Sequence, residues 1–102
     1  MKRYDKLVRD KIPEIIIADG KRCKSRILSD SEMQEYLLAK LSEEVGELQS
    51  KPCAEEIADV IEVLMALSTQ LGSSMSEVEN IRRMKHAARG GFDKRILLEF
   101  VE

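Results

Sequence analysis

The amino-acid sequence predicts an all-α fold: an antiparallel helical bundle in one domain that spans residues 1–102. Two Ser-x-x-Glu capping boxes, which begin at Ser29 and Ser74, mark the starts of two helices. After each helix start, and up to the next helix-breaking residues, apolar residues recur every three or four positions. This spacing is typical of helices that bury one side. Only 4% of the residues are aromatic, so the predicted core is aliphatic.

One short helix is predicted in the N-terminal region, over residues 9–18. Asp10 is its predicted cap, Pro13 lies in its first turn and Gly20 is its predicted stop. Residues 22–28 alternate loosely between apolar and polar side chains. They allow at most a short two-stranded pairing with residues 95–101 near the end of the chain.

Two long helices and one further helix are predicted next. The first runs from the capping box at Ser29 to about Gln49, and a tight turn over residues 49–52 follows. Pro52 suits the start of the second helix, which continues to Leu71 with Gly72 as its stop. The capping box at Ser74 opens the last helix, which is predicted to end before two glycines, Gly90 and Gly91.

Composition limits the classes of partner. The formal net charge is −2, so no general attraction to nucleic acid or to membranes is expected. Cys23 and Cys53 lack metal-binding spacing and are predicted to be reduced thiols, which together with the absence of an apolar leader indicates a cytoplasmic protein. Two apolar-striped helices on so short a chain predict burial against another subunit, in a homodimer or homotetramer whose assembly completes the core.

Four carboxylates flank the predicted turn: Glu44 and Glu47 before it, and Glu56 and Asp59 after it. Each pair is spaced i,i+3 and therefore lies on one side of its helix. In an antiparallel hairpin the two pairs face one small volume. Oxygen ligands in this arrangement suit a hard divalent cation such as Mg²⁺.

Projection onto ideal helices tests whether these carboxylates face inward. Glu56 lies about 20° from Val63 and Leu67, inside the apolar arc of its helix, and Glu44 lies about 20° from Leu37. Carboxylates that converge on an apolar surface are costly unless a cation relieves their repulsion. A solvated acidic surface on two amphipathic helices is the alternative.

At these residues the sequence resembles a known family. Residues 43–47 (EEVGE) and 56–59 (EIAD) resemble the EExxE…ExxD signature of the MazG-like, all-α nucleoside triphosphate pyrophosphohydrolases, a group that includes phosphoribosyl-ATP pyrophosphohydrolase. Residues 4–13 (YDKLVRDKIP) and 89–92 (RGGF) look like the two ends of a small subfamily, so the likeness extends over nearly the whole chain.

The resemblance implies that Glu44, Glu47, Glu56 and Asp59 hold Mg²⁺, with Mn²⁺ as a substitute. It also implies cleavage between the α- and β-phosphates of a nucleoside triphosphate, which yields a monophosphate and pyrophosphate. The sequence departs from the family pattern in one respect: only eight residues separate Glu47 from Glu56, fewer than in many relatives.

Phosphoanhydride hydrolysis requires an activated water and cations that neutralise the phosphates. Glu47 is favoured over Glu43 as the general base, since Glu43 points away from the other carboxylates on an ideal helix. The predicted substrate-binding residues are basic residues and glycines near the two ends: Lys6, Arg9, Lys11, Lys85, Arg89, Gly90, Gly91, Lys94 and Arg95.

Two other functions stay open at the sequence level. One is phosphoribosyl-ATP pyrophosphohydrolase activity in histidine biosynthesis. It stays open because no local motif indicates which nucleotide base the site recognises. The other is a non-enzymatic helical interaction module, which explains two amphipathic helices but not the inward position of Glu56.

Overall fold

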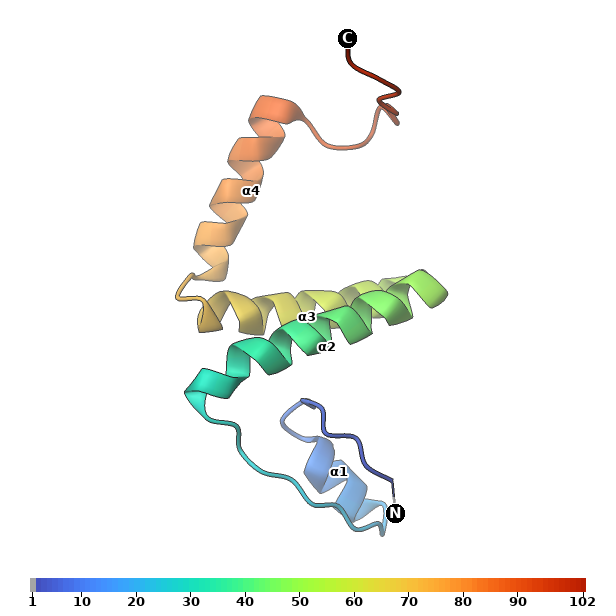
Figure 1. Cartoon of the computed structure of the whole chain (residues 1–102), viewed down its shortest axis with the longest axis vertical. Helices are drawn as coiled ribbons and strands as arrows, with labels where there is room; N and C mark the ends of the chain where they lie inside the picture. Colours follow the sequence, from blue (N-terminus) through green and yellow to red (C-terminus); the bar gives the residue numbers. More distant parts are fainter. Residues whose placement is uncertain (1) are drawn as a thin grey trace.

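A computed structural model describes residues 2–102 and shows four helices and no strand over that range (Figure 1). The all-α prediction is confirmed. The helices are α1 (Ile12–Ala18), α2 (Asp30–Ser50), α3 (Ala54–Gln70) and α4 (Met75–Arg89).

Both predicted capping boxes are present. The backbone N–H of Ser29 donates to Glu32 Oε1 at 2.9 Å, and the N–H of Glu77 donates to Ser74 Oγ at 3.1 Å. Hydrogen bonds from Arg26 and then from Ser29 lower the pKa of Glu32 to about 2. The start of α2 therefore carries a carboxylate that stays ionised well into acid.

Two helix starts differ from the sequence prediction. The N-cap of α1 is Lys11 instead of Asp10, because a turn in which Ile12 N–H donates to Arg9 O places Asp10 before the helix. Cys53 is the N-cap of α3 and has extended backbone, so Pro52 precedes the helix instead of lying in it. The helix stops are as expected: Gly72 and Gly90 adopt φ of +80° and +84°, which a side chain would disfavour.

The short pairing of residues 22–28 with 95–101 does not form. Residues 22–28 connect α1 to α2, whereas α4 carries residues 95–101 to the opposite end of the molecule (Figure 1). The two segments are therefore too far apart to exchange hydrogen bonds.

The antiparallel α2–α3 hairpin is the frame of the molecule. Its small core consists of Leu37, Val63 and Leu67, against which Leu7, Met33 and Leu41 pack. Among the four helices, α4 contacts α3 alone, so this chain forms a hairpin with appended segments instead of a closed bundle. Within residues 2–102, no helix combines the length and hydropathy needed to cross a membrane.

Candidate metal centre

Three of the four predicted ligand residues converge between the helices of the hairpin. Glu44 comes from α2, and Glu56 and Asp59 come from the first two turns of α3. One carboxylate oxygen from each residue lies within 4.8 Å of the other two. All three residues are half-buried, so their charges are only partly hydrated.

The local sequence explains this convergence. The chain leaves α2 at Ser50 and enters α3 at Ala54, so the short connection brings the last turns of α2 beside the first turns of α3. The i,i+3 spacing of Glu56 and Asp59 then places both side chains toward Glu44. The interval between Glu47 and Glu56, although short, is compatible with this register.

Glu47 lies outside the triad of Glu44, Glu56 and Asp59 and is exposed. Its charge nevertheless acts on the triad. Partial burial, followed by the negative charges of Asp59, Glu47 and Glu44, raises the pKa of the Glu56 carboxyl. The other three predicted carboxylates therefore all act electrostatically on Glu56.

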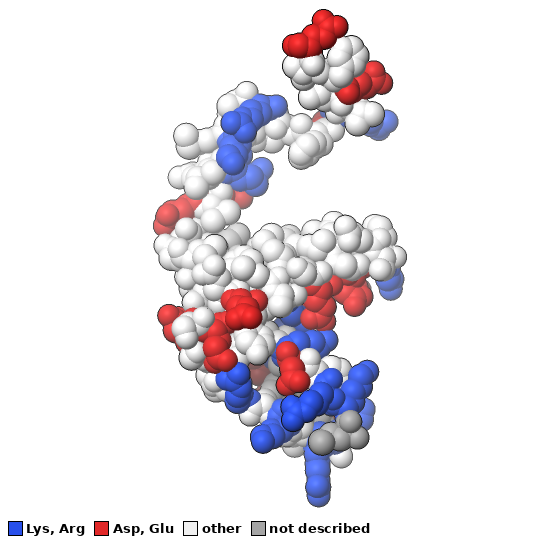
Figure 2. Space-filling model, viewed as in Figure 1, with Lys and Arg blue, Asp and Glu red and all other residues white. Residues whose placement is uncertain are grey.

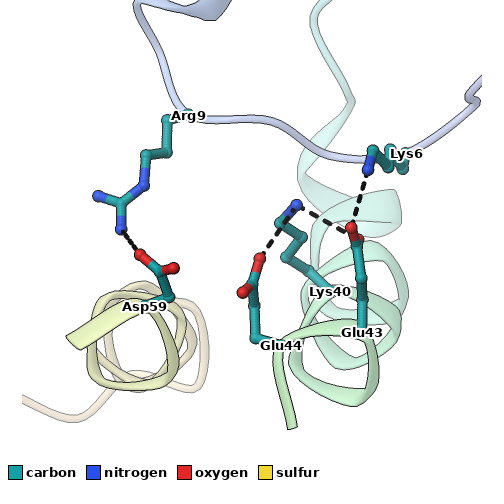
Figure 3. Close-up of polar contacts among 6 residues, drawn as sticks. All are labelled: Lys6, Arg9, Lys40, Glu43, Glu44 and Asp59. Atoms are coloured by element: carbon teal, nitrogen blue, oxygen red, sulfur yellow. Dashed lines mark hydrogen bonds and ion pairs between the residues drawn. The ribbon is translucent and has the colours of Figure 1, made fainter. Parts of the chain in front are cut away.

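Lys40 is a functional candidate that the sequence reasoning missed. Its side chain is only 16% exposed, and its Nζ lies 3.2 Å from Glu43 Oε2 and 3.4 Å from Glu44 Oε1. The ammonium group thus sits beside the carboxylate that α2 contributes to the triad (Figure 3). Its spacing from the two acids, i,i+3 and i,i+4, is visible in the sequence and indicates ion pairs on one helix.

The N-terminal segment, residues 2–11, supplies two further cations to this surface (Figure 3). Lys6 Nζ donates to Glu43 Oε1 at 2.8 Å, and this bond raises the pKa of Lys6 and lowers that of Glu43. Arg9 bridges two residues of α3, with its guanidinium nitrogens 2.8 Å from Asp59 Oδ1 and 3.2 Å from Glu62 Oε1. Two of the predicted phosphate-binding residues therefore lie at the carboxylates.

The other predicted substrate-binding residues are not brought to the triad. Lys11 is exposed and forms no ion pair with the residues that the structure describes. The remaining six lie on the C-terminal half of α4 or on the segment beyond it, across the hairpin from the N-terminal segment (Figure 1). These six are Lys85, Arg89, Gly90, Gly91, Lys94 and Arg95.

The donor set limits which metal ion the site can hold. Glu44, Glu56 and Asp59 offer carboxylate oxygens alone, and the triad contains neither histidine nor cysteine. Oxygen ligands of this kind fit Mg²⁺ or Mn²⁺ and do not fit a structural zinc site. With three carboxylates, such an ion retains positions for water or for phosphate oxygens.

Comparisons with known proteins give a partial likeness. Over 44 residues, which are 43% of this chain, the sequence is 54% identical to an uncharacterized protein of Mycolicibacterium smegmatis. The match spans 45% of that protein's length. No protein-family model and no solved structure matches the chain.

Proposed function

We propose that this protein is a Mg²⁺-dependent nucleoside triphosphate pyrophosphohydrolase of the MazG-like kind, which releases pyrophosphate and a nucleoside monophosphate. The observation that carries the proposal is the convergence of Glu44, Glu56 and Asp59 from two helices. These are three of the residues that the EExxE…ExxD resemblance assigns to the metal. The raised pKa of Glu56 supports the same assignment, because a cation at this place would relieve the repulsion among the carboxylates.

Mg²⁺, when bound, supplies charge neutralisation at the phosphates and lowers the pKa of a coordinated water. Glu44, Glu56 and Asp59 hold it. Glu47, exposed and next to the triad, is the better general base. Glu43 is the weaker candidate, since its ion pairs with Lys6 and Lys40 lower its pKa and occupy its carboxylate.

Lys6 and Arg9 are the cations placed to receive phosphate oxygens. Both side chains are about half exposed and reach the carboxylates from a segment outside the helices, so they can reorient without disturbing a helix. A guanidinium that binds two carboxylates in one state can bind a phosphate in another with the same donor geometry. Lys40, largely buried, stays at the base of the site and holds Glu44 in place.

The test is a nucleotide panel in which pyrophosphate and phosphate are measured separately, with and without Mg²⁺. The panel includes standard and modified nucleoside triphosphates and phosphoribosyl-ATP. We expect Mg²⁺-dependent release of pyrophosphate from at least one member.

The matched variants are Glu56→Gln and Glu55→Gln, which remove one charge each from neighbouring positions of α3. We expect Glu56→Gln to lose about 100-fold or more in kcat/KM, which corresponds to about 2.7 kcal/mol. Glu55, which is exposed and outside the triad, should tolerate the change. If no nucleotide yields pyrophosphate, or if both variants retain activity, the proposal is wrong.

A further inference from the structure

The last quarter of the chain has almost no packing partner within the chain. Every residue from 80 to 102 is exposed, and α4 contacts no helix other than α3. This stretch nevertheless carries large apolar side chains that are 55–97% exposed: Ile81, Met84, Phe92, Ile96, Leu97, Leu98, Phe100 and Val101. We call α4 together with residues 90–102 the C-terminal arm.

A second unpartnered apolar surface lies on the hairpin. It consists of Ile57, Ile61, Leu64 and Met65 of α3, with Leu38 of α2, and these side chains are 42–50% exposed. We call these five residues the apolar face. Ile61 projects about 160° from Asp59 on α3, so the apolar face lies on the opposite side of the helix from that ligand residue. Figure 2 shows the corresponding division, with acidic side chains gathered on the edge of the hairpin nearest the N-terminal segment.

The exposed area is far larger than a chain of this size normally has. Its accessible surface is 9483 Å², whereas a compact monomer of 11.6 kDa exposes roughly 5,800 Å². The radius of gyration is 18.0 Å, against about 13 Å for a compact domain of this length. So large an exposed surface, with large apolar side chains along both the arm and the apolar face, is unusual for a protein that works as a monomer.

We infer that the C-terminal arm of one copy covers the apolar face of a second copy, and that the second arm does the same in return. The excess is roughly 3,600 Å² for each chain, whereas obligate homodimers bury about 1,000–2,500 Å² per partner, so each chain exposes more than enough surface for such an interface. A reciprocal contact suits a second copy better than a foreign protein, because one chain carries both the unpartnered arm and the unpartnered face. The inference stands independently of the proposed function.

The distribution of charge also favours a second copy of the chain as the partner. Residues 82–95 of the arm contain six basic residues and one acid, Asp93. Residues 30–62, which include the hairpin's acidic edge, contain ten acids against Lys40 and Lys51. Arm and hairpin from two copies therefore attract each other at long range, which favours their encounter. The contact with the apolar face is itself apolar, because the acidic edge lies on the other side of α3.

The first experiment measures the mass of the full chain in solution by light scattering and by sedimentation. We expect at least twice 11.6 kDa at about 100 µM protein, a concentration well above the Kd of an obligate dimer. Leu98→Glu on the arm and Leu64→Glu on the apolar face should each shift the protein to the monomer mass. Ile17→Glu is the matched control, since Ile17 is 61% exposed on α1 and outside both surfaces.

The second experiment uses the unaltered chain, so it does not depend on whether a variant folds. Hydroxyl-radical footprinting should show protection of Met65 and Phe100, which are 44% and 72% exposed in one chain, relative to Tyr4 at 61%. A monomer mass, or labelling of Phe100 as fast as that of Tyr4, would overturn the inference. An oligomer that survives both Leu98→Glu and Leu64→Glu would also overturn it.

Discussion

At the scale of single residues, the charge of Glu56 suits a metal ligand in the candidate site but lowers the stability of the metal-free fold. Its carboxyl is partly buried and faces three other carboxylates, so ionisation is less favourable in the folded chain than in the unfolded one. We therefore expect Glu56→Gln to raise the melting temperature in the absence of divalent cations. Glu55→Gln, which removes a charge from an exposed position one residue away, should leave it nearly unchanged.

The pH dependence of this effect has a definite sign. Because the folded-state pKa of Glu56 is raised above the ordinary value of 4.5, the folded chain binds its proton more tightly. The stability of the unaltered protein relative to Glu56→Gln thus falls as pH rises from 4.5 through the raised folded-state pKa, and it stays low at neutral pH. Thermal melts at pH 4 and pH 7 with and without Mg²⁺ measure this. A stabilised variant that gains as much from Mg²⁺ as the unaltered protein would contradict the role of Glu56 as a ligand.

Lys40 shows what could have been predicted at this scale and what could not. Its spacing from Glu43 and Glu44 was visible in the sequence and predicted ion pairs on α2. Its 16% side-chain exposure could not be predicted, because burial depends on tertiary packing, which spacing along one helix does not specify. Helical projection likewise placed Glu44 and Glu56 inward but could not decide that Glu47 lies outside the triad.

At the scale of elements, capping chemistry made the helices predictable. The boxes at Ser29 and Ser74 and the stops at Gly72 and Gly90 act within one turn, so the sequence alone specifies them. The short pairing that the sequence allowed between residues 22–28 and 95–101 could not be decided locally, and it does not form. It required two segments separated by three helices to meet, and no local signal fixes the direction in which α4 leaves α3.

The N-terminal segment and the hairpin are joined by ion pairs, of which the Arg9–Asp59 pair at 2.8 Å bears most directly on the candidate metal site. A guanidinium on Asp59 competes with a divalent cation for the same carboxylate. We expect Arg9→Gln to tighten Mg²⁺ binding about three- to tenfold, as the removal of one nearby positive charge at partial exposure implies. Titration calorimetry without nucleotide measures this.

The matched control for Arg9→Gln is Lys11→Gln, which removes the same charge from the same segment at a residue without an ion pair among residues 2–102. Its Mg²⁺ affinity should stay within about twofold of the unaltered protein, because screening weakens a more distant charge. Weaker Mg²⁺ binding by Arg9→Gln would show that Arg9 positions Asp59 instead of competing for it.

At the scale of the whole molecule, the small core of Leu37, Val63 and Leu67 is the limiting feature. If reciprocal arms complete this core, unfolding is coupled to dissociation, and the melting temperature must rise with protein concentration. A 100-fold increase in concentration changes the free energy of dissociation by about 2.7 kcal/mol, which corresponds to several degrees in a domain of this size.

Leu64→Glu should melt at a lower temperature that no longer depends on concentration, whereas Ile17→Glu should follow the unaltered protein. Calorimetric scans from about 2 to 200 µM provide the measurement. A melting temperature constant over that range in the unaltered chain would mean that the hairpin is stable alone, and that the exposed arm has another role.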